Sequence, residues 1–197
     1  MSRSNRQLIM GLVAISCFSL TTGCTAIALG AVATIGATAS QDPRSIGTQI
    51  DDTNAVARIS LRLSEIEGLS EASDIEVDVF NRQLLLTGTI DDATWQPQIN
   101  AVLTGDPYLR KSHNQIRISM RLSTSMQAKD ILIANALRAK LLINKEIESN
   151  RINVVVNGGD VFLMGLLDNQ QATRAVEIAR NINNVKSVVR VFEIIQS

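Results

Sequence analysis

Apolar and polar residues alternate in two stretches of the chain, 75–88 and 152–165, and the two patterns match residue by residue. Turn residues interrupt each stretch, and in the second they are Gly158 and Gly159. This combination predicts a β-hairpin at both places. The copies are separated by 77 residues at each of fourteen consecutive positions. A constant offset indicates an internal duplication, so we expect two copies of one small module.

Apolar residues at helical spacing flank the first hairpin. They predict one helix over 53–66 and a second helix whose N-cap is Asp91 or Asp92. The segment before the first helix contains proline and glycine, which break regular structure, and the two acids at 51–52 can open the helix. Alternating residues over 115–122 predict the last strand of this module, with one side in water.

The second copy follows a short polar connection and repeats the same order. Its first helix should begin at Met126 or Ile131 and end at Asn144. After the hairpin, Asp168 can cap a second helix, and residues 187–195 should form the final strand. The order α-β-β-α-β therefore occurs twice.

This repeated order predicts an α+β fold with two tandem modules, 51–122 and 126–197. The connection between them has three residues, which leaves little slack, so the modules should touch. The outer hairpin face is more apolar in the second module, where Val155, Phe162 and Met164 replace Asp78, Leu85 and Thr87 of the first. An apolar sheet face is costly to leave in water, so we expect module one to cover it.

The N-terminus has the pattern of a secretory signal peptide. Two arginines and no acid occur in the first seven residues, and an apolar run over 8–20 follows that is too short to span a bilayer convincingly. The run ends in Leu20-Thr-Thr-Gly-Cys24, which resembles the lipobox of bacterial lipoproteins, although Thr21 stands where leucine is commonest. The resemblance implies cleavage after residues 1–23 and acylation of Cys24. The alternative is an ordinary signal peptide with an incidental cysteine.

Removal of the signal peptide would leave Cys24 as the one cysteine of the mature chain, because Cys17 is removed with it. No disulfide could then form within the chain. A multiply acylated cysteine, carrying palmitate or similar chains, is a lasting anchor because each buried methylene contributes about 0.8 kcal/mol. By resemblance to lipoproteins sorted on the next residue, Thr25 in place of Asp implies the outer membrane, facing the periplasm. Residues 24–50 would form the lipid-anchored tether.

The segment 42–52, the lipobox and the duplicated hairpin together resemble the dual BON-domain outer-membrane lipoproteins, and the likeness covers nearly the whole mature chain. The resemblance implies two BON modules, each with two helices on one face of a small mixed sheet. It also implies a role with phospholipid that helps to keep the outer membrane intact.

Charge and motifs argue against catalysis and nucleic-acid binding. The formal net charge is zero, with −4 on residues 51–122 and +2 on 123–197, so no global field attracts a polyanion. His113, the one histidine, lies in a polar sequence without an evident catalytic partner, and we interpret it as a surface loop residue. The sequence has no nucleophile elbow, phosphate-binding glycine loop or metal-ligand motif. We therefore expect no enzymatic activity, cofactor, metal or small-molecule substrate.

The first helix of module two has more apolar residues than one buried face requires. At 100° per residue, Ile133 and Leu137 fall on one side of the helix. A second stripe falls on the other side, with two cationic residues nearby: Leu132, Ala136, Ala139 and Ile143, with Arg138 and Lys140. A helix of this kind can rest on a lipid interface, so we hypothesise that these six residues contact anionic phospholipid.

Two alternatives fit the same stripe, because it could also pack on module one or bind a protein. The leading hypothesis is a non-enzymatic outer-membrane lipoprotein that binds anionic phospholipid through its second module and supports membrane integrity. The alternative is a periplasmic adaptor that binds an envelope assembly or quality-control factor.

Overall fold

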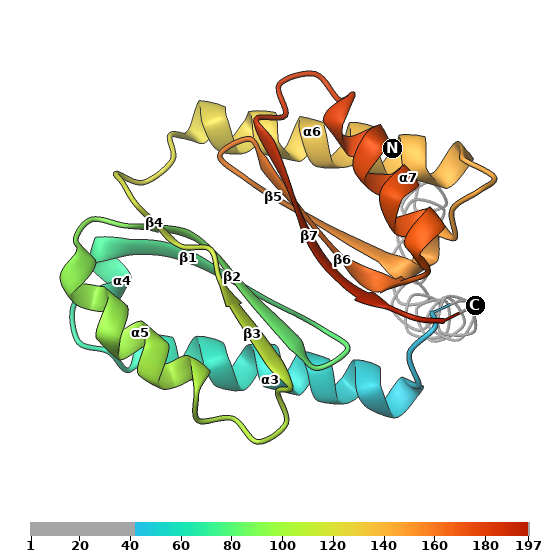
Figure 1. The fold of residues 1–197 in the computed structure, drawn as a ribbon. Helices are drawn as coiled ribbons and strands as arrows, with labels where there is room; N and C mark the ends of the chain where they lie inside the picture. Colours follow the sequence, from blue (N-terminus) through green and yellow to red (C-terminus); the bar gives the residue numbers. More distant parts are fainter. Residues whose placement is uncertain (1–41, 197) are drawn as a thin grey trace, which may run out of the picture. The chain divides into compact units, whose positions relative to one another are not determined.

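The computed structural model describes residues 42–196, which belong almost entirely to the compact unit Pro43–Ser197. The expected signal peptide 1–23, the acylation site Cys24 and the tether as far as residue 41 lie outside the described residues. The elements carry the labels of Figure 1, in which this unit begins with α3.

Module one contains the expected hairpin between helices, followed by a divided third strand. Its elements are α3 (Ile46–Ser64), α4 (Leu69–Ala72), β1 (Ser73–Phe80), β2 (Gln83–Ile90), a 3-10 helix (Ala93–Trp95), α5 (Gln96–Leu103), β3 (Lys111–Asn114) and β4 (Arg117–Ile118). Strand β1 is antiparallel to β2, and β2 is parallel to both β3 and β4. Both hairpin turn residues, Asn81 and Arg82, have positive φ, as a tight two-residue turn requires.

Module two repeats this arrangement with an unbroken third strand. Its elements are α6 (Thr124–Ile143), a 3-10 helix (Ser149–Arg151), β5 (Ile152–Asn157), β6 (Asp160–Leu167), α7 (Asn169–Arg180) and β7 (Ser187–Ile194). Strand β5 is antiparallel to β6, and β6 is parallel to β7. Asp168 accepts a hydrogen bond from the backbone of Gln171, which confirms it as the N-cap of α7.

In each module two helices cover one face of a small mixed sheet, as Figure 1 shows. The sheet has four strands in module one, where β3 and β4 both pair with β2, and three strands in module two. The core between α6, α7 and their sheet includes Leu137, Leu163 and Ala179, all fully buried. The equivalent core in module one includes Ile59, Leu86 and Ile99. The predicted α+β fold of two tandem modules is therefore confirmed.

The opposite faces of the two sheets pack on each other within the unit. A third apolar cluster joins residues from both modules: Phe80 and Leu85 with Val155, Phe162, Met164 and Val191. Its rim is polar, and the Arg110 guanidinium lies 2.9 Å from the Glu193 carboxylate. Module one thus covers the apolar sheet face of module two, as the sequence predicted.

The expected start of the first helix near residue 53 is wrong. Helix α3 begins at Ile46, inside the segment 24–50 that the sequence assigned to the tether, and Gly47 is accommodated in its first turn. The N-cap is Ser45, whose hydroxyl accepts a hydrogen bond from the backbone of Thr48 at 3.0 Å. Asp52 does not open the helix, because it lies within α3 and is buried.

The expected strand over 115–122 is also misplaced. Pairing with β2 begins at Lys111, is interrupted after Asn114, and ends at Ile118, which pairs with Ile90 at the end of β2. Among the described residues, 120–122 have no strand partner, because β2 ends at Ile90. The shift places His113 in β3, so the expectation of a loop position was wrong.

Candidate functional site

The apolar stripe predicted on α6 lies on the exposed side of that helix. Leu132 is 68 % exposed and Ile143 is 78 % exposed, and Ala136 and Ala139 between them are also exposed. The other side of α6 carries the buried core residues. The alternative that the stripe packs on module one is therefore wrong, and an apolar surface remains available to a ligand or partner.

Two lysines border this stripe on the side of α7. A shallow pocket of about 270 Å³ is lined by Lys129, Leu132, Ala136 and Lys140, together with Ile133 and residues 181–184, which follow α7. The ammonium group of Lys140 lies 3.5 Å from the carbonyl oxygen of Asn181. The pocket therefore places two cationic groups beside apolar side chains, a combination that is complementary to the surface of an anionic bilayer.

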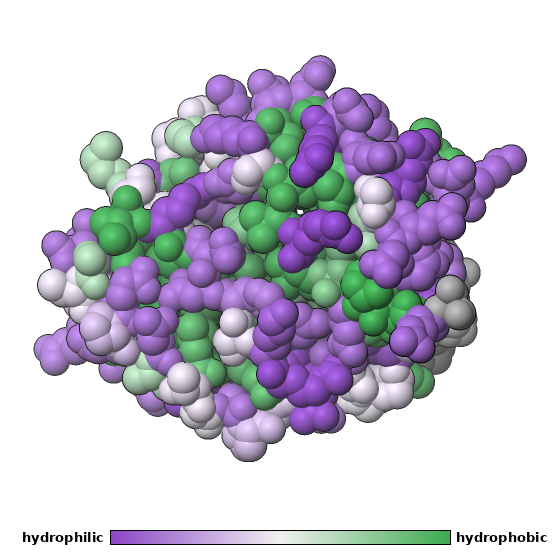
Figure 2. Space-filling view, viewed as in Figure 1, coloured by the Kyte–Doolittle hydropathy of each residue, from purple (hydrophilic) through white to green (hydrophobic). Residues whose placement is uncertain are grey.

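Arg138, which the sequence predicted to lie beside the stripe, is directed toward β5 instead. Its guanidinium donates a hydrogen bond of 2.7 Å to the carbonyl oxygen of Val154 at the edge of β5. Leu142, which the sequence did not assign to the site, is 73 % exposed and widens the apolar surface. Figure 2 shows, for the face that it draws, several separate hydrophobic areas set among hydrophilic side chains.

A buried aspartate connects the first helix of each module to its hairpin, and the sequence reading missed both. Asp52 accepts hydrogen bonds from the backbone of Asn81 and Arg82 at 2.7 and 2.9 Å. Asp130 makes the equivalent bonds to the two glycines of the second hairpin. The sequence did contain a signal for this contact, because one aspartate lies at a similar distance before each of the two hairpins.

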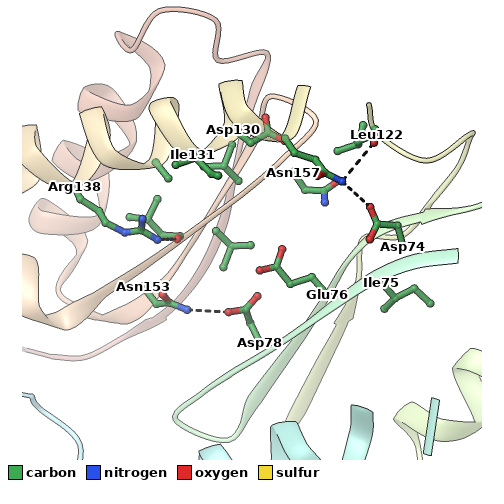
Figure 3. A pocket seen from close by; sticks show the side chains of 15 residues that line it. Asp74, Ile75, Glu76, Asp78, Leu122, Asp130, Ile131, Arg138, Asn153 and Asn157 are labelled. Carbon is green, nitrogen blue, oxygen red and sulfur yellow. Dashed lines mark hydrogen bonds between the residues drawn. The ribbon is translucent and has the colours of Figure 1, made fainter. Parts of the chain in front are cut away.

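Acidic side chains gather between the sheets on the β1 side. A cavity of about 510 Å³ is lined there by β1, β5 and α6, and Figure 3 shows Asp74, Glu76 and Asp78 projecting from β1 toward it. Burial raises the pKa of Glu76, and the neighbouring acids add to this effect. Burial also raises the pKa of Asp78, against the lowering effects of Asn153 and Arg138.

Within residues 42–196, the side chain that lies at hydrogen-bonding distance from His113 is an amide. The Nε2 atom of His113 lies 3.3 Å from Oε1 of Gln83, and burial, followed by the charge of Lys111, lowers the pKa of this histidine. Within residues 42–196, no group of three or more His, Cys, Asp or Glu side chains could hold a metal ion. Among the helices that the structure describes, none has the length and apolar character needed to cross a membrane.

Comparison with known proteins places the chain in a family. The BON domain matches residues 129–196. The chain is 32 % identical to the 21 kDa hemolysin of Actinobacillus pleuropneumoniae over 155 residues, which cover 79 % of this chain and 80 % of the relative. It is 26 % identical to Outer membrane lipoprotein DolP of Haemophilus influenzae over 171 residues, covering 87 % and 88 %.

Among solved structures, CdsD of Chlamydia trachomatis, a structural protein of a type III secretion system, gives a TM-score of 0.31 at 11 % identity. That likeness covers 73 % of this chain and 93 % of the other, and its low score supports no conclusion. The sequence relatives and the two described modules carry the assignment. The chain therefore belongs to the dual BON-domain lipoprotein family that includes Outer membrane lipoprotein DolP.

Proposed function

We propose that this chain is a non-enzymatic lipoprotein of the outer membrane that faces the periplasm, is anchored through acylated Cys24, and contacts anionic phospholipid through α6. Through that contact it supports the integrity of the membrane. The name of the Haemophilus relative, Outer membrane lipoprotein DolP, supports the location. The lipobox-like sequence before Cys24 supports the anchor.

The observation that carries the proposal is the exposure of Leu132 and Ile143 on one side of α6. Burial of apolar area stabilises contact by roughly 25 cal/mol per Å², and an interfacial helix gains this energy at the boundary between headgroups and acyl chains. Lys129 and Lys140 lie beside the stripe, where their ammonium groups can approach lipid phosphates. We expect this electrostatic part of the contact to weaken as salt rises.

The test is flotation of a fragment that starts at Asp42 with vesicles of phosphatidylglycerol and phosphatidylcholine. This fragment contains all three apolar clusters. We expect binding that increases with the anionic fraction and decreases with salt. Leu132→Glu and Ile143→Glu should abolish it, and Lys140→Gln should weaken it, while circular dichroism shows an unchanged fold.

Leu61→Glu is the matched control, because Leu61 is 60 % exposed on α3 of the other module. This variant should bind vesicles as the parent fragment does. Binding that is lost equally in the control, or a parent fragment that ignores anionic vesicles, would contradict lipid contact through α6.

A photo-reactive residue at position 143 distinguishes the adaptor alternative from lipid contact in cells. Adducts with lipid support the proposal. A single protein adduct in their place would favour a periplasmic adaptor, since Ile143 would then face a protein partner.

A further inference from the structure

Strand β1 has a free edge. Among the strands of residues 42–196, it is the outermost of its sheet and pairs with β2 only, in the order β1-β2-β3. The carbonyl oxygen of Leu86 in β2 accepts a hydrogen bond from Gln115, so the backbone of Leu86 faces away from β1. Val77 is the antiparallel partner of Leu86, and its N–H and C=O groups must therefore face away from β2. The same alternation applies to Ile75 and Val79.

The corresponding edge of module two is closed by an arginine. Val154 in β5 is the counterpart of Val77, and its carbonyl oxygen accepts the hydrogen bond from Arg138. Arg138 follows the buried Asp130 by eight residues. The residue that follows the buried Asp52 by eight is Ser60, whose side chain is far shorter. Module one therefore has no arginine at the position from which Arg138 covers the strand edge in module two.

An open cavity occupies the place of that arginine. It measures about 280 Å³ and is lined by residues of α3, α4 and β1, including Ser60, Leu63, Ile75 and Val77. Within residues 42–196, no hydrogen bond to the outward backbone of Ile75 or Val77 occurs. The edge of β1 is therefore accessible on the side of α3.

The other side of this edge opens into the acidic cavity of Figure 3. Asp74, Glu76 and Asp78 alternate with Ile75 and Val77, so they project to the sheet face opposite α3. Oδ2 of Asp78 is buried and has no hydrogen-bond partner among the described residues. A strand added to β1 would thus place alternate side chains beside acids and the others beside apolar groups.

We propose that the edge of β1 binds an extended segment of a partner protein, in which Lys or Arg alternates with small apolar residues. Main-chain hydrogen bonds to Ile75 and Val77 hold the segment, as in other complexes that add a strand to a sheet. Its basic side chains face Asp74, Glu76 and Asp78, and its apolar side chains enter the cavity beside Ser60. This contact is independent of the lipid contact through α6.

Charge selects a basic partner over a second copy of this chain. If the β1 strands of two copies paired, the acids of one copy would face those of the other, and like charges across strands are unfavourable. Charged residues on an edge strand protect it from such pairing. The three acids therefore leave the edge open to a segment of opposite charge.

The experiment uses the full chain in micelles of an uncharged detergent and an end-blocked peptide of four Lys-Val repeats. We expect saturable binding, with slowed hydrogen exchange at the amides of Ile75, Val77 and Val79. The amide of Val154 should not change, because Arg138 occupies that edge. A peptide of four Glu-Val repeats should not bind. Equal binding of both peptides, or protection elsewhere than β1, would overturn the proposal.

Ser60→Arg places an arginine in module one at the position that Arg138 occupies in module two, where it can cover the edge of β1. Ser60 is exposed, so this variant should fold normally, and it should weaken peptide binding at least about tenfold. Glu76→Gln should weaken binding about two- to fivefold, the range for one cross-strand charge pair. Asp51→Asn, on the exposed side of α3, removes the same charge away from β1 and should leave binding unchanged. Unchanged binding in Ser60→Arg would also overturn the proposal.

Discussion

The carboxylate of Asp130 accepts a hydrogen bond from the backbone N–H of Gly158 at 2.6 Å. Its other oxygen accepts one from Gly159 at 2.8 Å. Both glycines have positive φ, which directs their consecutive N–H groups toward the helix. Asp52 makes the same pair of bonds in module one. Each module therefore ties its first helix to its hairpin turn through a buried carboxylate.

Replacement of this carboxylate should strongly destabilise module two. Asp130→Ala leaves two buried N–H donors unpaired, and we expect the free energy of unfolding to fall by about 2–4 kcal/mol. Urea denaturation followed by circular dichroism measures the change. Asn135→Ala, at an exposed position of the same helix, is the control and should change stability by less than about 0.5 kcal/mol. Equal effects of the two substitutions would contradict the role of Asp130.

Gly88 should not tolerate a side chain. A Cβ atom at this position would lie 1.8 Å from the carbonyl oxygen of Asp74, and φ is +115°. We expect Gly88→Ala to lower the free energy of unfolding by more than about 2 kcal/mol. Gly47→Ala provides the contrast, since its Cβ would meet only Ser45 at 3.8 Å. It should stabilise helix α3 by about 0.5–1 kcal/mol, and a loss there would contradict the assignment of the helix start.

Tyr108 should resist ionisation in the folded chain. Burial, and then the hydrogen bond of 2.8 Å that its hydroxyl donates to Asp52, raise its pKa to about 12. Because an unfolded tyrosine ionises near pH 10, this group should contribute stability below about pH 10 that is lost as the pH rises to about 12. Absorbance titration of the one tyrosine measures the pKa. Asp52→Asn should lower it, and an unchanged value would exclude the hydrogen bond as a cause.

Asp78 should make stability depend on pH in the acid range. Burial raises its pKa in the folded state, so the folded chain binds its proton more tightly than the unfolded chain does. The carboxyl therefore favours folding at low pH, and this contribution is lost as the pH rises through the raised pKa. Asp78→Asn should flatten this dependence and raise stability at neutral pH by about 1 kcal/mol.

Unfolding by urea at several pH values tests that expectation. Asp51→Asn is the control, because it makes the same substitution at an exposed position, and it should change stability at neutral pH by less than about 0.5 kcal/mol. A lower stability of Asp78→Asn at neutral pH would show that the ionised carboxylate stabilises the fold, which contradicts the prediction.

Local patterns were sufficient for most of the fold. The period-two alternation and the repeat offset identified both hairpins, because side chains on a strand alternate between two faces whatever packs on them. Asp168 was identified as a cap because capping involves only neighbouring residues. The third strand of module one was misplaced because its limits depend on where β2 ends, at Ile90, and β2 is remote in sequence.

The sequence by itself determined the duplication, the order of elements and the second apolar stripe of α6, since each follows from residue spacing along one segment. Only the tertiary structure decided that Asp52 and Asp130 bind the hairpin turns, and that Arg138 closes one strand edge while Ser60 leaves the other open. These contacts join residues far apart in the chain. These contacts depend on the direction and length of each side chain in the folded state, and residue spacing along one segment does not specify which distant backbone group a side chain will meet.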